Sequence, residues 1–261
     1  MKTVKPKKFL GQHFLTDLKV AEDIADTLED FKNLPVLEVG PGMGVLTQFL
    51  IKKGYDLTVV ELDWDSVAYL KESYPQLNDR IIEADFLKLN LKELYKGEFC
   101  IIGNYPYNIS SQIFFKVLEY KDQIPCCSGM IQKEVAERMA AAPGSKTYGI
   151  LSVLMQAWYN IEYCFTVHEH VFNPPPKVKS AVIKMTRNEV KKLDCDEKLF
   201  KTVVKTAFNQ RRKTMRNSLK TLLGKDCDIF SDKIFDLRPE QISVAQFIDL
   251  TNLVAPYILK E

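Results

Sequence analysis

The chain has 261 residues, of which 46% are hydrophobic and 27% charged, and its formal net charge at pH 7 is +2. This is an ordinary globular composition, and a chain of this length can bury a full hydrophobic core without disulfides to stabilise it. No apolar stretch reaches membrane-spanning length, so a transmembrane protein is not expected. The small net charge excludes no partner, because the basic residues are concentrated locally.

Short apolar runs alternate with helical patterns through the first two thirds of the chain. Runs that are apolar on both faces suit the buried strands of a parallel sheet. Their alternation with amphipathic helical segments predicts βαβ units and a doubly wound α/β sheet. The strands predicted in this part are Val36–Val39, Leu57–Leu62, Arg80–Asp85, Phe99–Asn104 and Gly129–Gln132.

Two more strands are expected near the end of this sheet. A predicted helix over Ile150–Tyr159 is followed by strand patterns at Ile161–Val167 and Val178–Met185. Only one short segment separates these two strands, so they could pair antiparallel at a sheet edge.

The character of the chain changes near residue 189, after which only helical patterns remain. We therefore expect one α/β domain over residues 1–188, opening with a basic arm at 1–8, and a small all-helical domain over 189–261. The helices predicted in the second domain are Asp196–Phe208, Thr214–Leu223 and Val244–Leu253.

The six cysteines form no CxxC pair, and no histidine joins them at metal-ligand spacing. Cys126 and Cys127 are sequence neighbours, which is a poor geometry for a disulfide. We therefore expect reduced thiols and no metal. The first residues lack the apolar run of a signal peptide, so a cytoplasmic protein is the default expectation.

The first predicted strand runs into the glycine loop Glu38–Gly44, and acids end the next two strands at Glu61 and Asp85. Such glycines let a ligand approach the backbone at a helix N-terminus. Glu61 could accept both ribose hydroxyls of an adenosine, and Asp85 could accept from an adenine amino group. The carboxyl ends of parallel strands bind ligands, so the three features should meet. The loop alone also fits a tight strand-to-helix turn, and a nicotinamide site would more usually show GxGxxG.

The fourth predicted strand ends in Asn104-Tyr105-Pro106-Tyr107. The lone pair of an adenine N6 amine is delocalised into the ring, so a protein that alkylates it must localise and aim that pair. The side-chain oxygen of Asn104 and the backbone carbonyl of Tyr105 could accept from the amino hydrogens, with Pro106 holding the carbonyl in place. Tyr107 offers a face on which an extruded base could stack. The alternative is a proline-containing turn with a core tyrosine.

Taken together, these residues resemble the ribosomal RNA small-subunit (16S) adenine N6-dimethyltransferase family (KsgA/RsmA), over nearly the whole chain. The resemblance implies a Rossmann-like S-adenosylmethionine-dependent methyltransferase sheet of seven mostly parallel strands, with an antiparallel final strand and a small helical C-terminal domain. The segments that carry it are Lys7–Leu15, Glu38–Thr47, Gly103–Asn108, Gln132–Arg138, Phe172–Val182 and Phe208–Leu219.

The resemblance implies a substrate and a set of site residues. The substrate would be two adjacent adenosines near the 3′ end of 16S rRNA in a pre-30S particle, giving N6,N6-dimethyladenosine with a role in small-subunit biogenesis. Tyr105 departs from the family, in which an aliphatic residue is commoner, but the expected hydrogen bond uses its backbone. The residues expected to bind the cofactor are His13, Leu15, Gly40, Gly42, Glu61, Asp85 and Asn104.

An RNA-binding surface is also expected. Phe172 precedes three prolines and Lys177, and its ring could hold the second face of the target base, or it could pack under a rigid loop. Basic residues between 211 and 216 would bind phosphates, which position RNA without reading its sequence. The alternative for them is a solvated helix face. The N-terminal lysines could form an arm that orders on binding. The residues expected to bind RNA are Lys177, Arg211, Arg212, Lys213 and Arg216.

Three rival functions remain at this point. A 23S rRNA methyltransferase of the Erm type would share the chemistry, although Phe208–Leu219 looks like the 16S type. An assembly factor would act mainly by binding the particle. A nicotinamide dehydrogenase is a distant alternative. A monomer is expected, with no membrane partner.

Overall fold

The computed structural model describes residues 4–7 and 10–259, and it contains two compact units. Unit 1 comprises Met1–Ala136 and Asn160–Arg187, and unit 2 comprises Glu137–Tyr159 and Asn188–Glu261. The segment 137–159 therefore packs with the C-terminal helices.

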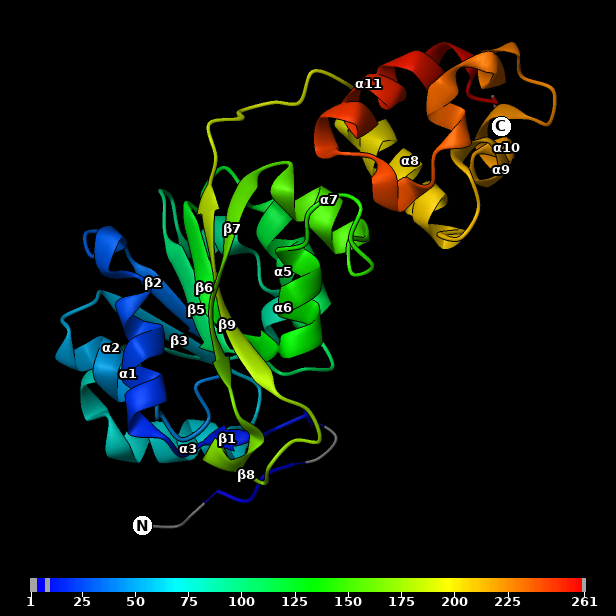
Figure 1. Ribbon diagram of the computed structural model, residues 1–261. Coiled ribbons are helices and arrows are strands. Elements are labelled where there is room, and N and C mark those ends of the chain that lie inside the picture. Colours follow the sequence, from blue (N-terminus) through cyan, green and yellow to red (C-terminus); the bar gives the residue numbers. More distant parts are fainter. Residues whose placement is uncertain (1–3, 8–9, 260–261) are drawn as a thin grey trace. The chain divides into compact units, whose positions relative to one another are not determined.

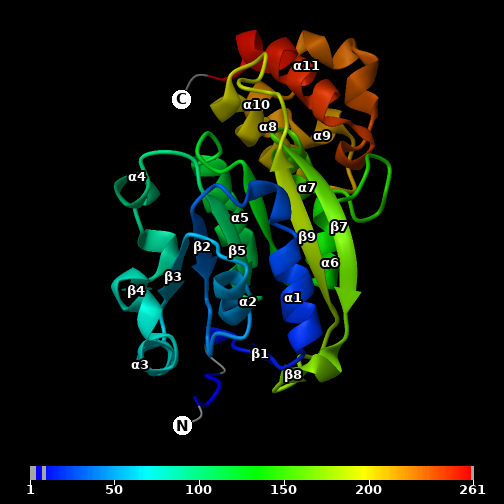
Figure 2. The same ribbon diagram turned by 90° about the vertical axis from the view of Figure 1, so that its left-hand side faces the viewer.

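Unit 1 is built on a seven-stranded sheet with the order β4-β3-β2-β5-β6-β9-β7. The first five strands of this order pair in parallel, and β9 pairs antiparallel to β6. The strand β7 lies beyond β9 at the edge of the sheet and runs in the direction opposite to β9 (Figure 2). The strands are β2 (Val36–Val39), β3 (Leu57–Glu61), β4 (Ile81–Glu83), β5 (Cys100–Asn104), β6 (Cys126–Gln132), β7 (Tyr159–Val167) and β9 (Ser180–Arg187).

Helices cover both faces of this sheet, with α1 and α2 on one face and α5 on the other (Figure 1). The sequence fixes where two of them start, because the Asp17 and Asp63 side chains accept backbone N–H groups at the N-termini of α1 and α3. The helices are α1 (Leu18–Asp26), α2 (Thr47–Lys52), α3 (Trp64–Ser73), α4 (Leu91–Leu94) and α5 (Ser110–Glu119), while α6 (Lys133–Met139) spans the boundary of the units.

Seven predicted strands and their parallel arrangement are confirmed, with boundaries that shift by a few residues. The largest shift is at β6, which begins at Cys126 instead of Gly129, and β4 ends at Glu83. Asp85 lies beyond it as the N-cap of a short 3₁₀ turn, η4 (Phe86–Lys88). The sequence pattern did not predict a second, two-stranded sheet, in which β1 (Phe14–Leu15) pairs with β8 (Phe172–Asn173).

Unit 2 is helical, as expected for the C-terminal part, and aromatic side chains fill its core. The rings of Phe200 and Trp158 meet edge to face, and Phe208 contacts both Tyr148 and Phe247. The single helix predicted over Thr214–Leu223 is wrong, because it breaks at Leu219. The helices are α7 (Ile150–Gln156), α8 (Glu197–Asn209), α9 (Met215–Ser218), α10 (Lys220–Leu223) and α11 (Val244–Val254). Within the described residues, no helix is long and apolar enough to cross a membrane.

Candidate active site

A cavity of about 250 Å³ opens at the carboxyl ends of β2, β3 and β5. Strand order reverses between β2 and β5, and ligands bind at such switch points of open α/β sheets. The glycine loop, the two strand-end acids, the turn after β5 and the segment before α1 all line this cavity. Its lining thus includes each expected cofactor residue: His13, Leu15, Gly40, Gly42, Glu61, Asp85 and Asn104.

The glycine loop approaches other parts of the cavity too closely for a side chain. Gly42 has φ +55°, and a Cβ atom there would lie 2.9 Å from the Phe14 ring. Its N–H donates to the Glu61 carboxylate at 3.0 Å. Glycine is required at this position because of both the backbone conformation and the contact.

Glu61 is buried and held by backbone donors. Besides the N–H of Gly42, its carboxylate accepts from the N–H groups of Leu62 and Asp63, both at 2.9 Å. Burial raises the pKa of Glu61, and these three hydrogen bonds act in the opposite direction. A carboxylate has about four acceptor positions, so about one remains for an incoming hydroxyl. That Glu61 takes both ribose hydroxyls stays a prediction.

Glu38 lies deeper, at the end of β2, and its side chain is fully buried. It accepts a hydrogen bond from the Thr47 hydroxyl at 2.7 Å. Burial raises the pKa of Glu38 to about 8, although the bond from Thr47 opposes this shift. At neutral pH Glu38 is therefore mostly protonated.

Asp85 points one carboxylate oxygen back onto its own loop. Its Oδ1 accepts from the backbone N–H of Leu87 at 3.0 Å, which is the N-cap bond of η4. The other oxygen is 3.8 Å from the Lys88 ammonium, on an exposed side chain. The loop thus fixes the carboxylate at the cavity wall.

The amide of Asn104 has a defined orientation. Its Nδ2 donates to the backbone carbonyl of His13 at 3.2 Å, which leaves Oδ1 as an acceptor facing the rest of the turn. Among the described residues, neither Oδ1 nor the carbonyl of Tyr105 accepts a hydrogen bond. Both residues that carry the expected acceptors line the cavity.

Tyr105 is 1% exposed and occupies a slot between two strands. Gly103 and Gly129 face one another in the register of β5 and β6, and a Cβ on Gly129 (φ +151°) would lie 2.6 Å from the tyrosine ring. The hydroxyl of Tyr105 donates to the carbonyl of Ser128 at 2.6 Å. The side chain thus anchors the turn while its backbone stays at the cavity.

Tyr107 stands at the cavity wall and is held on two sides. Its ring stacks on His13, with centroids 5.5 Å apart and planes inclined by 26°. Its hydroxyl is hydrogen-bonded to the buried hydroxyl of Ser180 in β9. The Nδ1 of His13 lies 2.8 Å from the carbonyl of Pro174, which can only accept, so Nδ1 carries the proton. The sequence analysis missed Ser180, because a lone serine in a strand gives no signal.

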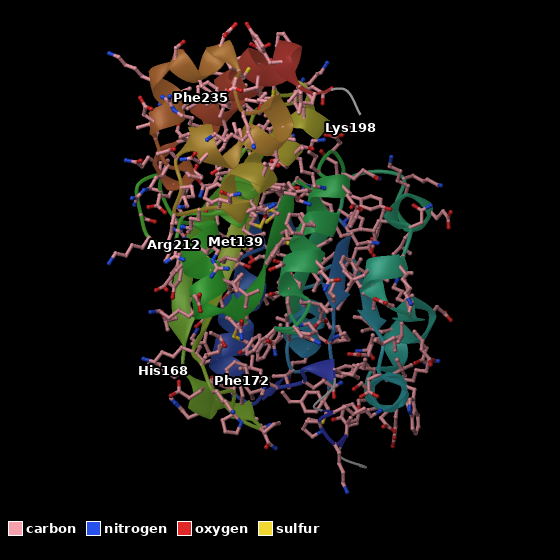
Figure 3. The ribbon with its side chains drawn as sticks, turned by 90° about the vertical axis from the view of Figure 1, so that its right-hand side faces the viewer. Met139, His168, Phe172, Lys198, Arg212 and Phe235 are labelled. Carbon is pink, nitrogen blue, oxygen red and sulfur yellow. The ribbon has the colours of Figure 1, made fainter. Side chains whose placement is uncertain are left out.

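Phe172 does not line the cavity. It is 4% exposed, pairs with Leu15 across β1 and β8, and belongs to the hydrophobic core (Figure 3). Of the two alternatives given for this ring, the geometry favours packing under the proline-rich loop. Lys177 follows in that loop and is exposed.

The basic cluster in unit 2 is less uniform than its sequence suggests. Arg211 donates to the Glu240 carboxylate at 2.9 Å and to the Lys146 carbonyl, and Arg216 pairs with Asp236 at 2.6 Å. Arg212 and Lys213 are exposed and have no ion-pair partner among the described residues (Figure 3 labels Arg212). The acids come from segments 20 or more residues away, so the local sequence gave no sign of them.

The N-terminal segment is tied to the start of α3. Lys7 forms ion pairs with Asp63 and Asp65, and its Nζ lies 5.2 Å from the centre of the Trp64 ring. Gln12 also donates to Asp63, at 3.2 Å. Lys2 and Lys8 of the predicted arm lie outside the described residues.

The cavity fits S-adenosylmethionine by its chemistry. A Cβ on Gly40 would meet only Pro106, at 3.9 Å, so the backbone there borders open space. Buried carboxyl groups and apolar side chains line the cavity together, as an adenosine with polar edges and flat faces requires. Within residues 4–7 and 10–259, no three His, Cys, Asp or Glu side chains are grouped as a metal site would need.

The sheet order, the glycine loop and the strand-end acids together define a Rossmann-like methyltransferase that uses S-adenosylmethionine. A family model described as "Ribosomal RNA adenine dimethylase" matches residues 3–255. The chain belongs to this family, and it is an S-adenosylmethionine-dependent rRNA adenine dimethyltransferase.

Relatives with known names resemble the chain over its full length. "Ribosomal RNA small subunit methyltransferase A" of Parabacteroides distasonis is 71% identical over 261 residues, which cover 100% of this chain and 98% of that protein. The protein of the same name from Bacteroides thetaiotaomicron is 73% identical over 255 residues, covering 97% and 96%.

Solved structures share the fold. A dimethyladenosine transferase from Plasmodium falciparum aligns with a TM-score of 0.78 at 23% identity, covering 94% of this chain and 98% of that one. The 23S rRNA methyltransferase ErmE aligns with a TM-score of 0.67 at 25% identity, covering 92% and 99%.

Proposed function

We propose that the chain dimethylates N6 of two adjacent adenosines near the 3′ end of 16S rRNA, within the pre-30S particle. Relatives named for the small ribosomal subunit, more than 70% identical over almost the whole chain, support this choice of RNA. The product would be N6,N6-dimethyladenosine, and the reaction would be a step of small-subunit biogenesis.

The orientation of Asn104 is the observation that carries the chemistry. Because Nδ2 is committed to the His13 carbonyl, Oδ1 is the group available to accept an amino hydrogen. The carbonyl of Tyr105 would accept the other hydrogen. Two acceptors on one side of the amine favour a pyramidal nitrogen, whose lone pair then points away from them and into the cavity.

When bound, S-adenosylmethionine supplies a methyl group on a sulfonium, which is already a strong electrophile. The protein therefore has to align the amine rather than activate the methyl group, and alignment with electrostatic fit accounts for most of the rate. No general base is required, because the proton can leave to water after transfer. Pro106 restricts the carbonyl of Tyr105, and Tyr107 offers its face to the extruded base.

The cofactor would be held along the cavity by the strand ends. We assign the ribose to Glu61, the adenine amino group to Asp85 and the close backbone contact to Gly40 and Gly42. His13 and Leu15 would cover it from the N-terminal segment, which lies on the same cavity.

RNA contacts are proposed at Lys177 in unit 1 and, separately, at Arg212 and Lys213 in unit 2, whose exposed charges have no acidic partner in the described part of the chain. Arg211 and Arg216 would contribute less, since each already faces an acid. We assign the RNA-contacting role mainly to residues 189–261 and the catalytic role to residues 1–188. The working form is proposed to be a cytoplasmic monomer.

The rival substrate is 23S rRNA. ErmE, which has the same fold, is a 23S rRNA methyltransferase, so this substrate has to be tested. A protein acting chiefly as an assembly factor would bind the particle without needing Asn104.

One experiment separates these functions. Purified protein and radiolabelled S-adenosylmethionine are incubated with undermethylated small subunits, with large subunits and with fully methylated small subunits as a control. The proposal expects label only in the first, recovered as N6,N6-dimethyladenosine after nuclease digestion. Label in the large subunit alone would reassign the chain to 23S rRNA. Binding without any transfer, in the presence of bound cofactor, would leave the assembly role.

A further inference from the structure

Lys116 is a buried lysine that the proposed reaction does not use. It lies on α5, the helix that follows the catalytic turn, and is only 7% exposed. Lysine is rarely buried without a partner, because removing an ammonium from water is costly. What its charge contacts therefore indicates what it does.

The ammonium of Lys116 donates its hydrogen bonds to the backbone of one loop. Its Nζ donates to the carbonyl of Leu87 at 3.0 Å and to that of Leu89 at 2.5 Å. It also lies 5.5 Å from the centre of the Phe86 ring and 5.6 Å from that of Tyr120. Two carbonyls and two aromatic faces satisfy this cation, and none of the residues that the structure describes brings a carboxylate within hydrogen-bond range of it.

The loop it holds is the one that carries Asp85 into the cavity. Asp85, Phe86 and Leu87 all line that cavity. Leu87 links the two charges through its own peptide groups: its N–H donates to Asp85 Oδ1, and its carbonyl accepts from Lys116. The N-terminal end of η4 is thus capped by Asp85, and its C-terminal end by a cation, which is the favourable arrangement for a helical turn.

A second set of contacts fastens the same loop to the end of α5. The hydroxyl of Tyr120 accepts from the N–H of Leu91 at 3.3 Å and donates to Asn90 at 3.4 Å. Burial lowers the pKa of Lys116, while the nearby charges of Glu119 and Asp85 act in the opposite direction. The loop and the helix that begins at the catalytic turn are therefore one connected piece of structure.

We propose that Lys116 is a positioning residue for cofactor recognition: it fixes the loop Phe86–Leu89 so that Oδ2 of Asp85, the oxygen not bonded to Leu87, faces the adenine amino group. This inference rests on the assignment of Asp85 in the proposed function. Lys116 itself touches no reacting atom, so its loss should weaken selection of the adenine ring and leave methyl transfer at saturation nearly intact.

The test compares two ligands that differ at the adenine amino group. S-adenosylhomocysteine has this group, and S-inosylhomocysteine carries a carbonyl oxygen in its place. Affinities for both are measured by calorimetry on the full chain, for the wild type, K116M, K116Q and the exposed control K71M. The wild type and K71M should prefer the adenosyl ligand by about tenfold or more, because a carboxylate would lose a hydrogen bond and meet a carbonyl.

For K116M we expect this preference to fall to about threefold or less, with K116Q in between because its uncharged amide still has N–H donors. The KM for S-adenosylmethionine should rise about 5- to 30-fold in K116M, with kcat within about threefold of wild type, as lost ground-state binding predicts. A general loss of stability would weaken binding of both ligands equally and would not change the ratio of their affinities.

The outcomes are distinguishable. If the wild type does not discriminate between the two ligands, the assignment of Asp85 fails and this inference fails with it. If the wild type discriminates and a folded K116M or K116Q does so equally, Asp85 stands and only the role of Lys116 is refuted. Should K116M not fold, K116Q decides by the same criterion.

Discussion

The Nδ2 atom of Asn104 lies 3.2 Å from the carbonyl oxygen of His13, and this bond joins the N-terminal segment to the turn after β5. The two residues are 91 positions apart in the chain. One hydrogen bond thus fixes both the orientation of the amide and the position of the segment that covers the cavity. Substitutions at Asn104 should accordingly lower the rate of methyl transfer more than they weaken binding of the particle.

Replacing Asn104 by alanine should lower methyl transfer about 100-fold or more, because the acceptor for the amino hydrogen is removed. Replacement by aspartate keeps an acceptor but places a negative charge against the His13 carbonyl, so an intermediate loss is expected. Both variants should still bind the small-subunit particle. The assay is initial-rate transfer of labelled methyl groups, with filter binding as the control. Near-normal turnover in Asn104→Ala would remove this residue from the mechanism.

Tyr107 should act through its ring rather than its hydroxyl. Tyr107→Phe keeps the stack on His13 and loses only the bond to Ser180, so activity should remain within about fivefold of wild type. Tyr107→Ala removes the stacking face, and base stacking is worth about 1–3 kcal/mol, or roughly a 5- to 150-fold loss. Single-turnover rates on undermethylated particles measure this. Equal losses in the two variants would assign the role to the hydroxyl instead.

The raised pKa of Glu38 should make the stability of the protein depend on pH. Its pKa is about 8 in the folded protein against an ordinary value of 4.5, so between these values the folded chain holds a proton that the unfolded chain releases. Stability from this group is complete below pH 4.5 and falls as the pH rises to 8, by up to about 1.4 kcal/mol per pH unit. Glu38→Gln should flatten that slope while keeping the bond from Thr47. Urea unfolding of both proteins without cofactor, from pH 5 to 8, measures it; parallel slopes would mean that Glu38 is ionised when folded.

The basic cluster should divide into two kinds of residue. Replacing both Arg212 and Lys213 by alanine should weaken particle binding. The slope of log affinity against log salt concentration should become shallower by about 1.5, since each lost phosphate contact reduces it by roughly 0.7–0.9. Arg211→Ala should act on stability, because it breaks the contacts with Glu240 and Lys146. Affinities between 50 and 300 mM salt and thermal unfolding separate these effects. An unchanged slope in the double variant would make Arg212 and Lys213 ordinary surface residues.

The fold could be predicted because its signals are local. The apolar runs predicted the strands, the glycine loop predicted the switch point, and the acids Glu61 and Asp85 could be placed on the cavity in advance, although Asp85 lies just beyond its strand. Hydrophobic periodicity decides such elements without reference to the rest of the chain.

What could not be predicted depends on residues that are distant in sequence. Phe172 and Leu15 meet only because two short strands pair across some 157 residues, and that pairing buries the ring. Lys116 reads as one polar position on an amphipathic helix, and nothing nearby indicates the carbonyls of Leu87 and Leu89. Glu240 and Asp236 pair with arginines that had no acid in their own segment.

The slot around Tyr105 has a consequence for engineering base selectivity. A Cβ on Gly129 would lie 2.2 Å from the carbonyl oxygen of Gly103, a backbone atom, so no change at position 105 could make room for it. Position 105, in contrast, carries a buried ring whose hydroxyl donates to the carbonyl of Ser128 and lies 3.4 Å from the Cys127 sulfur. A mutant library built to accept other nucleobases should hold both glycines constant and vary position 105, whose residue lines the cavity.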